Sequence, residues 1–362
     1  MLAFVLRRLG VMVLTALALT FIVFWLTNLP PNLEKLAKSE GSVRMADDAV
    51  TSWLERNGHT GPMIYRYGQW LGVVPGWTFT DAAKGTVTGR CFAAGEDPAT
   101  AARFCGILQG NWGWSTVFKQ TVADVLGRSL SLTGWLMLWV MIVMVPTALI
   151  IGVLAGMNEG SRTDRVLSTF AIATTATPEY VSGVIFIALF ASATAGISPW
   201  LAEMGWISGK TLFQGTATSA MDKITFWNFA LPVLTIALYG IGYIARMTRA
   251  SMTEVMTQQY IRTARLKGVR FRDVVFRHAL RNALIAPFTV IMLQFPWLLN
   301  GVVIVETLFN YKGFGWTLVQ AAGNNDIPLL LGCSVVAVFV VLVTQLISDI
   351  GYVFLNPRIR LA

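Results

Sequence analysis

Long apolar stretches alternate with shorter polar ones along this chain. A helix needs about 20 mostly apolar residues to cross a bilayer. Six segments reach that length: 9–28, 130–156, 166–195, 228–248, 284–306 and 329–355. Prolines fall in or at the ends of several of them, which a membrane protein tolerates where neighbouring helices satisfy the freed backbone groups. The pattern predicts an all-α integral membrane protein with six transmembrane helices.

The first apolar segment follows Arg7 and Arg8, as the apolar part of a signal peptide would. It is longer than the roughly 7–15 residues of a signal peptide, and no small-residue cleavage site follows it. We therefore expect this segment to be retained as a membrane span.

Lys and Arg residues mark one side of the membrane, because short cytoplasmic loops are enriched in them. They gather before the first span, in the loops 157–165 and 246–283, and in the tail after 355. The opposite short loops hold few: Lys210, Lys223 and Lys312. Six spans place all the basic segments together, so both termini are expected to be cytoplasmic; an odd number of spans would break this agreement.

On this topology the chain divides into three segments. Residues 1–28 form the N-terminal segment and first transmembrane helix, 29–118 an extracytoplasmic insertion, and 119–362 a five-helix core with a cytoplasmic loop at 250–283. The insertion contains Cys91 and Cys105. In an oxidising compartment these two should form a disulfide, and the alternative is a pair of free thiols.

Composition agrees with a membrane protein, since 55% of residues are hydrophobic and only 13% are charged. Soluble domains carry about 25% charged residues. The net charge of +9 could suggest nucleic acid. The basic residues lie between membrane spans, however, so no nucleic-acid partner is expected.

Catalytic and metal-binding patterns are weak. The stretch "GWISGKT" places three residues between Gly205 and Gly209, whereas a phosphate-binding loop needs four. The two histidines, His59 and His278, have no metal-ligand spacing. We therefore predict no enzymatic activity, no metal site and no cofactor bound by this chain.

Three polar residues inside predicted spans are candidates for the translocation pathway: Glu179, Gln294 and Asn300. Polar groups in a membrane are costly and often functional. In a straight helix, Glu179 would lie about 21 Å from the cytoplasmic end of its span. The alternative is local: Glu179 caps the backbone freed by Pro178, and the two amides bond neighbouring helices.

The loop at 246–283 is more basic than topology requires. It carries nine cationic residues: Arg246, Arg249, Arg262, Arg265, Lys267, Arg270, Arg272, Arg277 and Arg281. The stretch "SMTEVMTQQYIRTARLK" has helical composition, and Gly268 is expected to end that helix. "FRDVVFRHALRN" then begins a helix leading into the fifth span. A projecting helix–glycine–helix indicates a docking element; the alternative partner is anionic lipid.

The residues of this loop and of several other stretches resemble those of a known family. "EVMTQQYIRTARLKGVRFRDVVFRHALRNALIAP" resembles the cytoplasmic loop of binding-protein-dependent ABC-transporter permeases, and more narrowly the dipeptide/oligopeptide/nickel class. The stretches "FVLRRLGVMV", "SRTDRVLSTFAIATTATPEYVSG" and "ETLFNYKGFGWTLVQAAGNNDIPLLLG" also resemble that class. The similarity covers 1–30 and about 112–362. One departure is the run from Arg262 to Ala264, where the general permease motif has Glu-Ala-Ala.

The resemblance implies a type I ABC importer permease fold, with the insertion placed after the first helix. It implies a multi-pass protein of the bacterial inner membrane that forms half of a pathway for a peptide or similar small solute. The coupling residues that it implies are Tyr260, Arg262, Thr263, Ala264, Arg265, Lys267 and Gly268.

The partners implied are a second homologous permease subunit, two ATP-binding subunits that hold ATP and Mg²⁺, a substrate-binding protein and membrane lipid. The substrate, and whether the permease pair is homomeric or heteromeric, stay open. A competing reading is a membrane-bound enzyme or sensor with a lipid-binding basic loop.

Overall fold

In the computed structural model, the chain forms two compact units. One consists of Leu130–Trp316 and Val340–Ala362, and the other of Leu2–Ser129 and Thr317–Phe339. The structure describes residues 2–81, 86–92, 96 and 100–355, and it describes side chains over the same ranges except at 2–5, 295–297, 299–301 and 352–355. The units follow packing contacts, whereas the three sequence segments follow predicted membrane boundaries.

Four helices among the described residues are long and apolar enough to cross a membrane. They are α1 (Leu2–Thr27), α5 (Val122–Met157), α9 (Phe226–Met256) and α15 (Ile327–Leu355). Two bent helix pairs also pass the same test together. The predicted number of six spans is reached when each bent pair counts as one.

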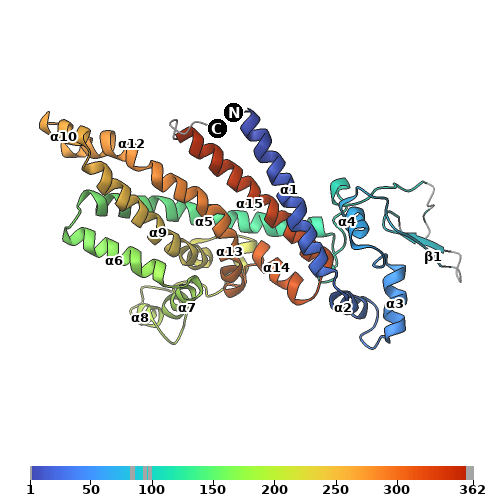
Figure 1. The fold of residues 1–362 in the computed structure, drawn as a ribbon. Coiled ribbons are helices and arrows are strands. Elements are labelled where there is room, and N and C mark those ends of the chain that lie inside the picture. Colours follow the sequence, from blue (N-terminus) through green and yellow to red (C-terminus); the bar gives the residue numbers. More distant parts are fainter. Residues whose placement is uncertain (1, 82–85, 93–95, 97–99, 356–362) are drawn as a thin grey trace. The chain divides into compact units, whose positions relative to one another are not determined.

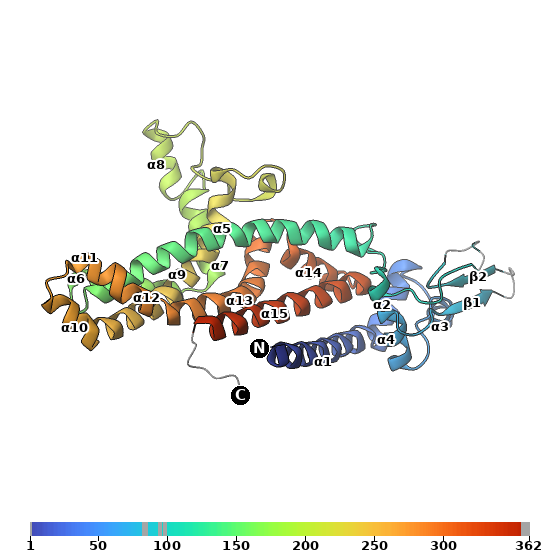
Figure 2. The same cartoon turned by 90° about the horizontal axis from the view of Figure 1, so that it is seen from above.

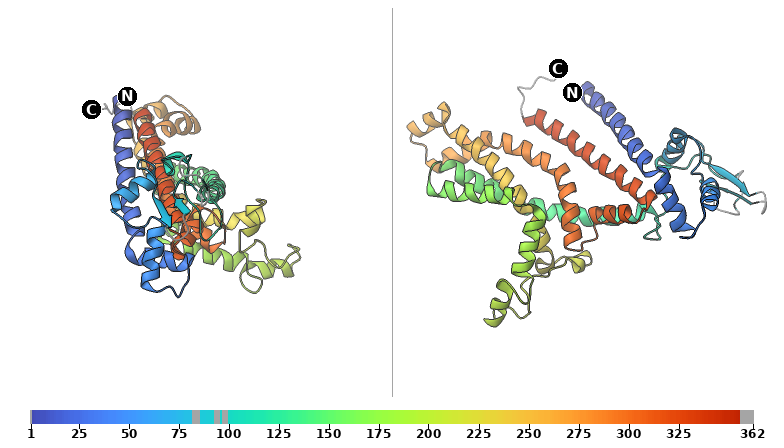
Figure 3. Two further views of the ribbon diagram at one scale, coloured as in Figure 1. Left: turned by 90° about the vertical axis from the view of Figure 1, so that its right-hand side faces the viewer. Right: turned by 60° about the horizontal axis from the view of Figure 1, so that its bottom comes forward.

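The first bent pair corrects the prediction of a continuous helix over 166–195. Here α6 (Arg162–Ala176) and α7 (Glu179–Phe190) meet at 105°, and Figure 3 (right) shows the yellow-green α7 turning away from the green α6. Pro178 disfavours helical geometry at the preceding residue, and Thr177 is extended, with ψ 121°. The depth calculated for Glu179 in a straight helix therefore does not apply.

The second bent pair joins the basic loop to α13 (Ile285–Leu308). The helical stretch Phe271–Ala283 meets the first part of α13 at 51°. The prediction that the helix after Gly268 leads into the fifth span therefore holds, but with a bend at the junction.

Helix α9 is the centre of the unit that contains Leu130–Trp316. It packs against α6, α7 and α13, and α6 and α9 run beside each other in Figure 1. Close approach requires glycine: a Cβ on Gly242 would lie 2.4 Å from the Ala171 carbonyl oxygen, and one on Gly152 would lie 2.4 Å from Thr248. Small residues of this kind let membrane helices pack backbone to backbone.

The segment between α7 and α9 projects from this unit. It contains α8 (Ile197–Glu203) and a 3₁₀ turn at Thr218–Met221. In Figure 2, α8 stands away from α6 and α9.

The insertion lies in the other unit. It contains α2 (Pro30–Glu40), α3 (Asp47–Arg56), α4 (Met63–Leu71), strands β1 (Thr78–Asp81) and β2 (Thr86–Gly89), and a 3₁₀ turn at Ile107–Gln109. The strands pair antiparallel, with Thr78 opposite Gly89. This hairpin lies within residues 32–111, to which the sequence prediction assigned no fold.

The core of the insertion is aromatic and aliphatic. Tyr67 and Trp70 are buried against Phe24 of α1 and Leu331 of α15. Tyr65, in contrast, is half exposed. Cys91 and Cys105 form a disulfide, which ties the segment after β2 to the segment before the 3₁₀ turn.

Candidate functional site: the basic loop

The basic loop is built from four helical pieces that follow α9. These are α10 (Gln259–Leu266), α11 (Phe271–Asp273), a π-helical stretch Val274–Ala279 and α12 (Leu280–Ala283). Figure 1 shows α10 at the end of α9, with α12 leading back into α13.

Two residues anchor α10 to the rest of the loop. Ile261 is fully buried and Ala264 is 8% exposed. They are three residues apart, so they share one face of the helix. That face packs into a cluster with Met252 of α9 and with Val274 and Val275 of the π-helical stretch. The hydrophobic anchor explains why so polar a helix has a fixed place.

The other face of α10 is open. Among the predicted coupling residues, those that are exposed are Tyr260, Arg262, Thr263, Arg265, Lys267 and Gly268. Ala264 differs from them, because it lies in the core of the loop. Leu266 is 80% exposed, and the sequence prediction did not include it. The sequence feature that could have identified Leu266 is an apolar side chain in a strongly polar helix.

Gly268 ends α10 in the way the sequence predicts. Its φ is +73°, in the left-handed region. The Gly268 N–H donates to the Arg265 carbonyl at 3.0 Å, and the Val269 N–H donates to the Ala264 carbonyl at 3.2 Å. This pair of bonds is a Schellman motif, which satisfies carbonyls that the helix end leaves free.

Polar bonds also tie the loop together. The Asn282 side chain donates to the Tyr260 hydroxyl at 3.0 Å, which joins α12 to α10. The Ser251 hydroxyl donates to the Ala283 carbonyl at 2.8 Å, which joins α9 to α12. The loop is therefore one packed body on the end of α9.

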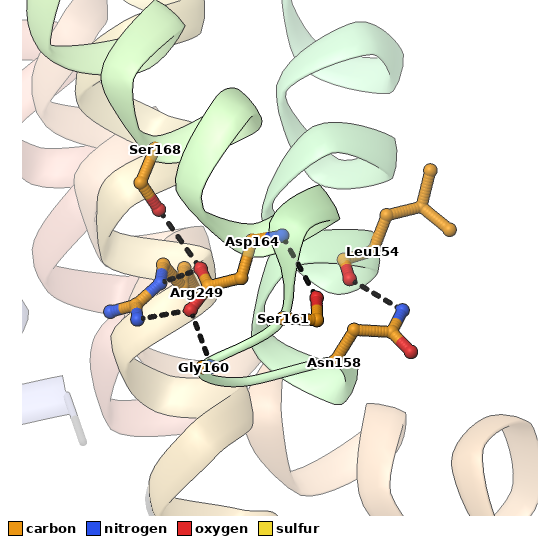
Figure 4. A network of polar contacts seen from close by, with 7 residues as sticks. All are labelled: Leu154, Asn158, Gly160, Ser161, Asp164, Ser168 and Arg249. Carbon is orange, nitrogen blue, oxygen red and sulfur yellow. Dashed lines mark hydrogen bonds and ion pairs between the residues drawn. The ribbon is translucent and has the colours of Figure 1, made fainter.

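An ion pair fixes α9 to α6 near this end. Arg249 binds Asp164 with two bonds, Nε to Oδ1 at 2.5 Å and Nη2 to Oδ2 at 2.8 Å (Figure 4). Asp164 also accepts bonds from the Gly160 N–H and the Ser168 hydroxyl, and its own N–H bonds to Ser161. Its side chain is 4% exposed. A buried carboxylate with this many donors holds a defined geometry.

The pathway candidates have contrasting surroundings. Glu179 is the first residue of α7, and its Oε2 is buried without a hydrogen-bond partner among the described residues. The N-terminus of α7 has no side-chain cap, so the alternative capping role is not observed. Gln294 is buried in α13 and makes no bond to a neighbouring helix within the described part of the chain. The side chain of Asn300 lies outside the described residues.

Sequence reasoning missed a buried acid, Glu306, near the end of α13. Its carboxylate accepts bonds from the Thr133 hydroxyl of α5 and from the Trp316 N–H, while the Phe314 N–H donates to Thr133 at 2.7 Å. A Cβ on Gly313 would lie 2.1 Å from the Glu306 carboxylate, so only glycine fits there. The available signal was the "ETLFNYKGFG" stretch, in which one acid precedes a glycine-rich turn.

Metal-binding groups are not observed in the described parts of the chain. No cluster of three or more His, Cys, Asp or Glu side chains there could hold a metal ion.

Comparison with known proteins gives consistent relatives. A family model described as "Binding-protein-dependent transport system inner membrane component" matches residues 148–361. The di/tripeptide transport system permease protein DppB of Pseudomonas aeruginosa is 31% identical over 371 residues, which covers 99% of each chain.

Two further relatives match shorter stretches. A probable peptide ABC transporter permease protein of Sinorhizobium fredii is 35% identical over 254 residues, covering 70% of this chain and 77% of the relative. The glutathione transport system permease protein GsiC of Escherichia coli K12 is 31% identical over 253 residues, covering 70% and 76%.

The family model spans more than half of the chain and includes the whole basic loop. Its members are permease components rather than enzymes, and separate ATP-binding subunits hydrolyse ATP. The competing reading as a membrane-bound enzyme or sensor is thereby set aside. This chain belongs to the family of binding-protein-dependent transport system inner membrane components, with the type I ABC importer permease fold.

Proposed function

We propose that this permease subunit carries peptides or similar small solutes into the cell. The support comes from relatives whose names describe peptide, di/tripeptide and glutathione permeases. In this proposal the chain forms half of the pathway, and a second homologous permease subunit forms the other half. A substrate-binding protein delivers the solute, and two ATP-binding subunits hold ATP and Mg²⁺; this chain binds neither.

The proposed topology places both termini and the basic loop in the cytoplasm. Arg and Lys residues favour this side for the loop that contains α10. The insertion then faces the opposite compartment, where a substrate-binding protein can contact it. Exposed residues of the insertion, such as Tyr65, would contact the substrate-binding protein, whereas the buried Tyr67 and Trp70 belong to the core of the insertion.

We propose that α10 is the coupling helix, which docks in a cleft of an ATP-binding subunit. The observation that carries this proposal is the division of α10 into an anchored face and an open face. Ile261 and Ala264 hold the helix, while Leu266 and the cationic residues stay accessible. A loop whose basic residues served only to set the membrane orientation would need charge, but it would not need a helix anchored by buried apolar residues.

The anchored loop also explains how force would reach the spans. A displacement of α10 acts on α9 through Met252 and the Ser251–Ala283 bond. The Asp164–Arg249 pair then carries the displacement to α6. Alternating access requires such packed connections, because rigid-body motions are transmitted through contacts that differ between two states.

The test replaces Leu266 with glutamate. Leu266 is 80% exposed and outside the loop core, so the chain should fold and insert normally. A buried leucine side chain contributes roughly 1.5–3 kcal/mol, so its loss and the added charge should weaken co-purification with the ATP-binding subunit by about tenfold or more. Transport should fall in parallel. Leu108→Glu is the matched control, since Leu108 is 68% exposed in the insertion.

Unchanged co-purification and ATP-driven uptake in Leu266→Glu would refute docking through α10. The substrate class has a separate test, which is to identify the ligand that co-purifies with the cognate substrate-binding protein. A sugar or a metal complex in place of a peptide would overturn the substrate proposal and leave the coupling proposal intact.

We further propose that Glu179 and Gln294 face the solute route. The unpartnered Glu179 Oε2 supports this, because a buried carboxylate oxygen without a protein partner is costly. Cysteine at either position should react with a small hydrophilic thiol reagent in at least one transport state. Lack of reaction at both positions, with and without ATP and the loaded binding protein, would remove them from the route.

A further inference from the structure

The insertion contains a pocket that the transport proposal does not use. Its volume is about 390 Å³, within the range of small-molecule sites. All of its lining residues belong to the unit formed by Leu2–Ser129 and Thr317–Phe339. Its walls include several tryptophans, and two arginines line it: Arg66 of α4 and Arg90, directly after β2.

Arg66 is only 8% exposed, and several contacts hold its side chain in this pocket. Its Nη2 donates to the Asn28 side chain and lies 3.5 Å from Nδ1 of His59. Its guanidinium also stacks at 6.0 Å from the Phe24 ring. A guanidinium has five N–H donors, and these contacts involve only one of its three nitrogens.

Arg90 is fixed by the disulfide region. Its Nε donates to the Cys105 carbonyl at 2.9 Å, and its backbone N–H donates to the Trp77 carbonyl at 3.0 Å. Cys105 is bonded to Cys91, the residue after Arg90. The side chain of Arg90 is therefore held in place, and its terminal nitrogens have no hydrogen-bond partner within the part of the chain that the structure describes.

Neither guanidinium has a carboxylate partner among the described residues. Glu40 also lines the pocket, yet it forms no ion pair with Arg66 or Arg90. His59 adds no third cation near neutral pH, because burial and the two guanidiniums lower its pKa to about 4. A buried cation without a counter-charge is costly, and a carboxylate would meet its bonding capacity bidentately.

The remaining walls suit a flat or apolar body. Trp53 stacks on the His59 ring at 5.8 Å with an interplanar angle of 10°. Trp77 lies against Gly58, where a Cβ would come within 2.2 Å of the indole ring. These contacts fix the positions of two of the rings. The pocket therefore combines fixed cations with fixed aromatic walls.

We propose that this pocket binds a small organic carboxylate with an apolar or aromatic body, with Arg66 and Arg90 as its anion-binding residues. The carboxylate has two possible sources, a free solute or an acidic side chain of the substrate-binding protein. Binding to the chain itself is the claim, and it does not depend on which solute the transporter carries.

The first arm of the test uses the full-length chain in lipid nanodiscs and N-acetyl-phenylalanine as the probe. Equilibrium dialysis should show saturable binding of the carboxylate. The neutral amide of the same compound should bind at least about tenfold more weakly, because it lacks the charge that strengthens hydrogen bonds to the two guanidiniums. This comparison needs no variant, so it is independent of folding defects.

Variants then locate the site. Arg90→Gln and Arg66→Gln should each weaken binding of the carboxylate by about tenfold or more and leave the weak binding of the amide unchanged. Arg56→Gln is the matched control, because Arg56 is exposed at the end of α3 and does not line the pocket. It should bind the carboxylate as the unmodified chain does. If Arg66→Gln fails to fold, Arg90→Gln still tests the site.

The second arm separates the two sources. The affinity of the cognate substrate-binding protein for the assembled transporter is measured with and without the probe. Competition by the probe, together with weaker docking of the Arg90→Gln variant, assigns the carboxylate to the binding protein. Probe binding without competition assigns it to a free solute. Equal binding of acid and amide, or no binding in either arm, would overturn the proposal.

Discussion

At Gly268 the backbone adopts φ +73°, and this one residue decides where α10 stops. No atom lies within 4 Å of a Cβ built there, so the requirement is conformational rather than steric. Gly313 is the opposite case, since a Cβ there would collide with the Glu306 carboxylate. Individual residues thus act on this fold through two separate physical limits, backbone strain and lack of space.

Gly268→Ala tests the first limit. The left-handed conformation costs an L-residue about 1–2 kcal/mol, so amides of α10 should exchange with solvent roughly ten times faster. Gly268→Pro should have a larger effect, because proline fixes φ near −65° and removes the N–H that bonds to Arg265. Gly127→Ala, at an exposed site in helix α5, should stabilise or be neutral. Equal exchange in Gly268→Ala and Gly127→Ala would contradict the strain argument.

The His59 side chain makes the insertion sensitive to pH. Its pKa is lowered from 6.5 to about 4 by burial and by the nearby guanidiniums. Well above pH 6.5 the imidazole is neutral in both the folded and the unfolded chain. As the pH falls towards 4, the unfolded chain takes up a proton that the folded insertion resists, so stability is lost, by at most about 3 kcal/mol.

Hydrogen exchange in the insertion should therefore accelerate between pH 6.5 and 4, after correction for intrinsic exchange. His59→Gln should remove this component, and His278→Gln, in the basic loop, should leave it unchanged. An identical pH profile for His59→Gln and the unmodified chain would show that another group is responsible.

At the scale of elements, α9 connects the parts of its unit. It packs against α6, α7 and α13, and it continues beyond the apolar stretch into the basic loop. Among the described residues, the Asp164–Arg249 pair joins it to α6 by an ionic bond. Because α6 bends into α7 at Pro178, a rotation of α6 about its own axis changes the direction in which α7 points.

A double-mutant cycle measures the strength of this connection. Asp164→Asn and Arg249→Gln should each destabilise the unit by about 2–4 kcal/mol, since each leaves a buried or partly buried charge without its partner. The double variant should cost much less than the sum. The surface pair Glu34–Lys38 in α2 is the matched control, with little or no coupling expected, because solvent screens surface ion pairs. Additive effects at Asp164 and Arg249 would show that the pair contributes no coupling.

At the scale of the whole molecule, the sequence predicts the fold class and the permease family correctly, for a physical reason. Lipid requires long apolar helices, and this requirement is visible in one dimension. The break between α6 and α7 was harder to predict. Pro178 indicates a kink, but an angle of 105° depends on how α7 packs against α9 and α13. Glu306 was missed because its donors, Thr133 and Trp316, are distant in sequence or contribute only a backbone N–H.

The pocket of the insertion could not be predicted from the sequence either, because its lining residues are distant from one another along the chain. Arg66 and Arg90 are 24 positions apart by their numbers, and the pocket also takes residues from the ends of α1 and the start of α15. Nothing in a linear pattern brings these segments together. The disulfide between Cys91 and Cys105 could be predicted from the sequence, because disulfide formation depends mainly on residue type and compartment.

Removing the disulfide should loosen the insertion as a body. Closing a loop of about 15 residues contributes roughly 3 kcal/mol in the chain-entropy model. A Cys91→Ser, Cys105→Ser double variant should therefore be cut faster by protease within the insertion, with the basic loop unaffected. Reductant should accelerate cleavage of the unmodified chain but not of the variant. Equal protease resistance in all of these samples would show that the bond does not brace the insertion.

The two-sided construction of α10 has a consequence for how transporters of this kind diverge. Two inward residues, Ile261 and Ala264, fix the helix, so the outward residues can change without disturbing the fold of the loop. On the docking proposal, those outward residues determine which ATP-binding subunit the permease binds. If the exposed residues of α10 are exchanged for those of a paralogue, the permease should bind the ATP-binding subunit of that paralogue. Its transported solute and its membrane helices should stay the same.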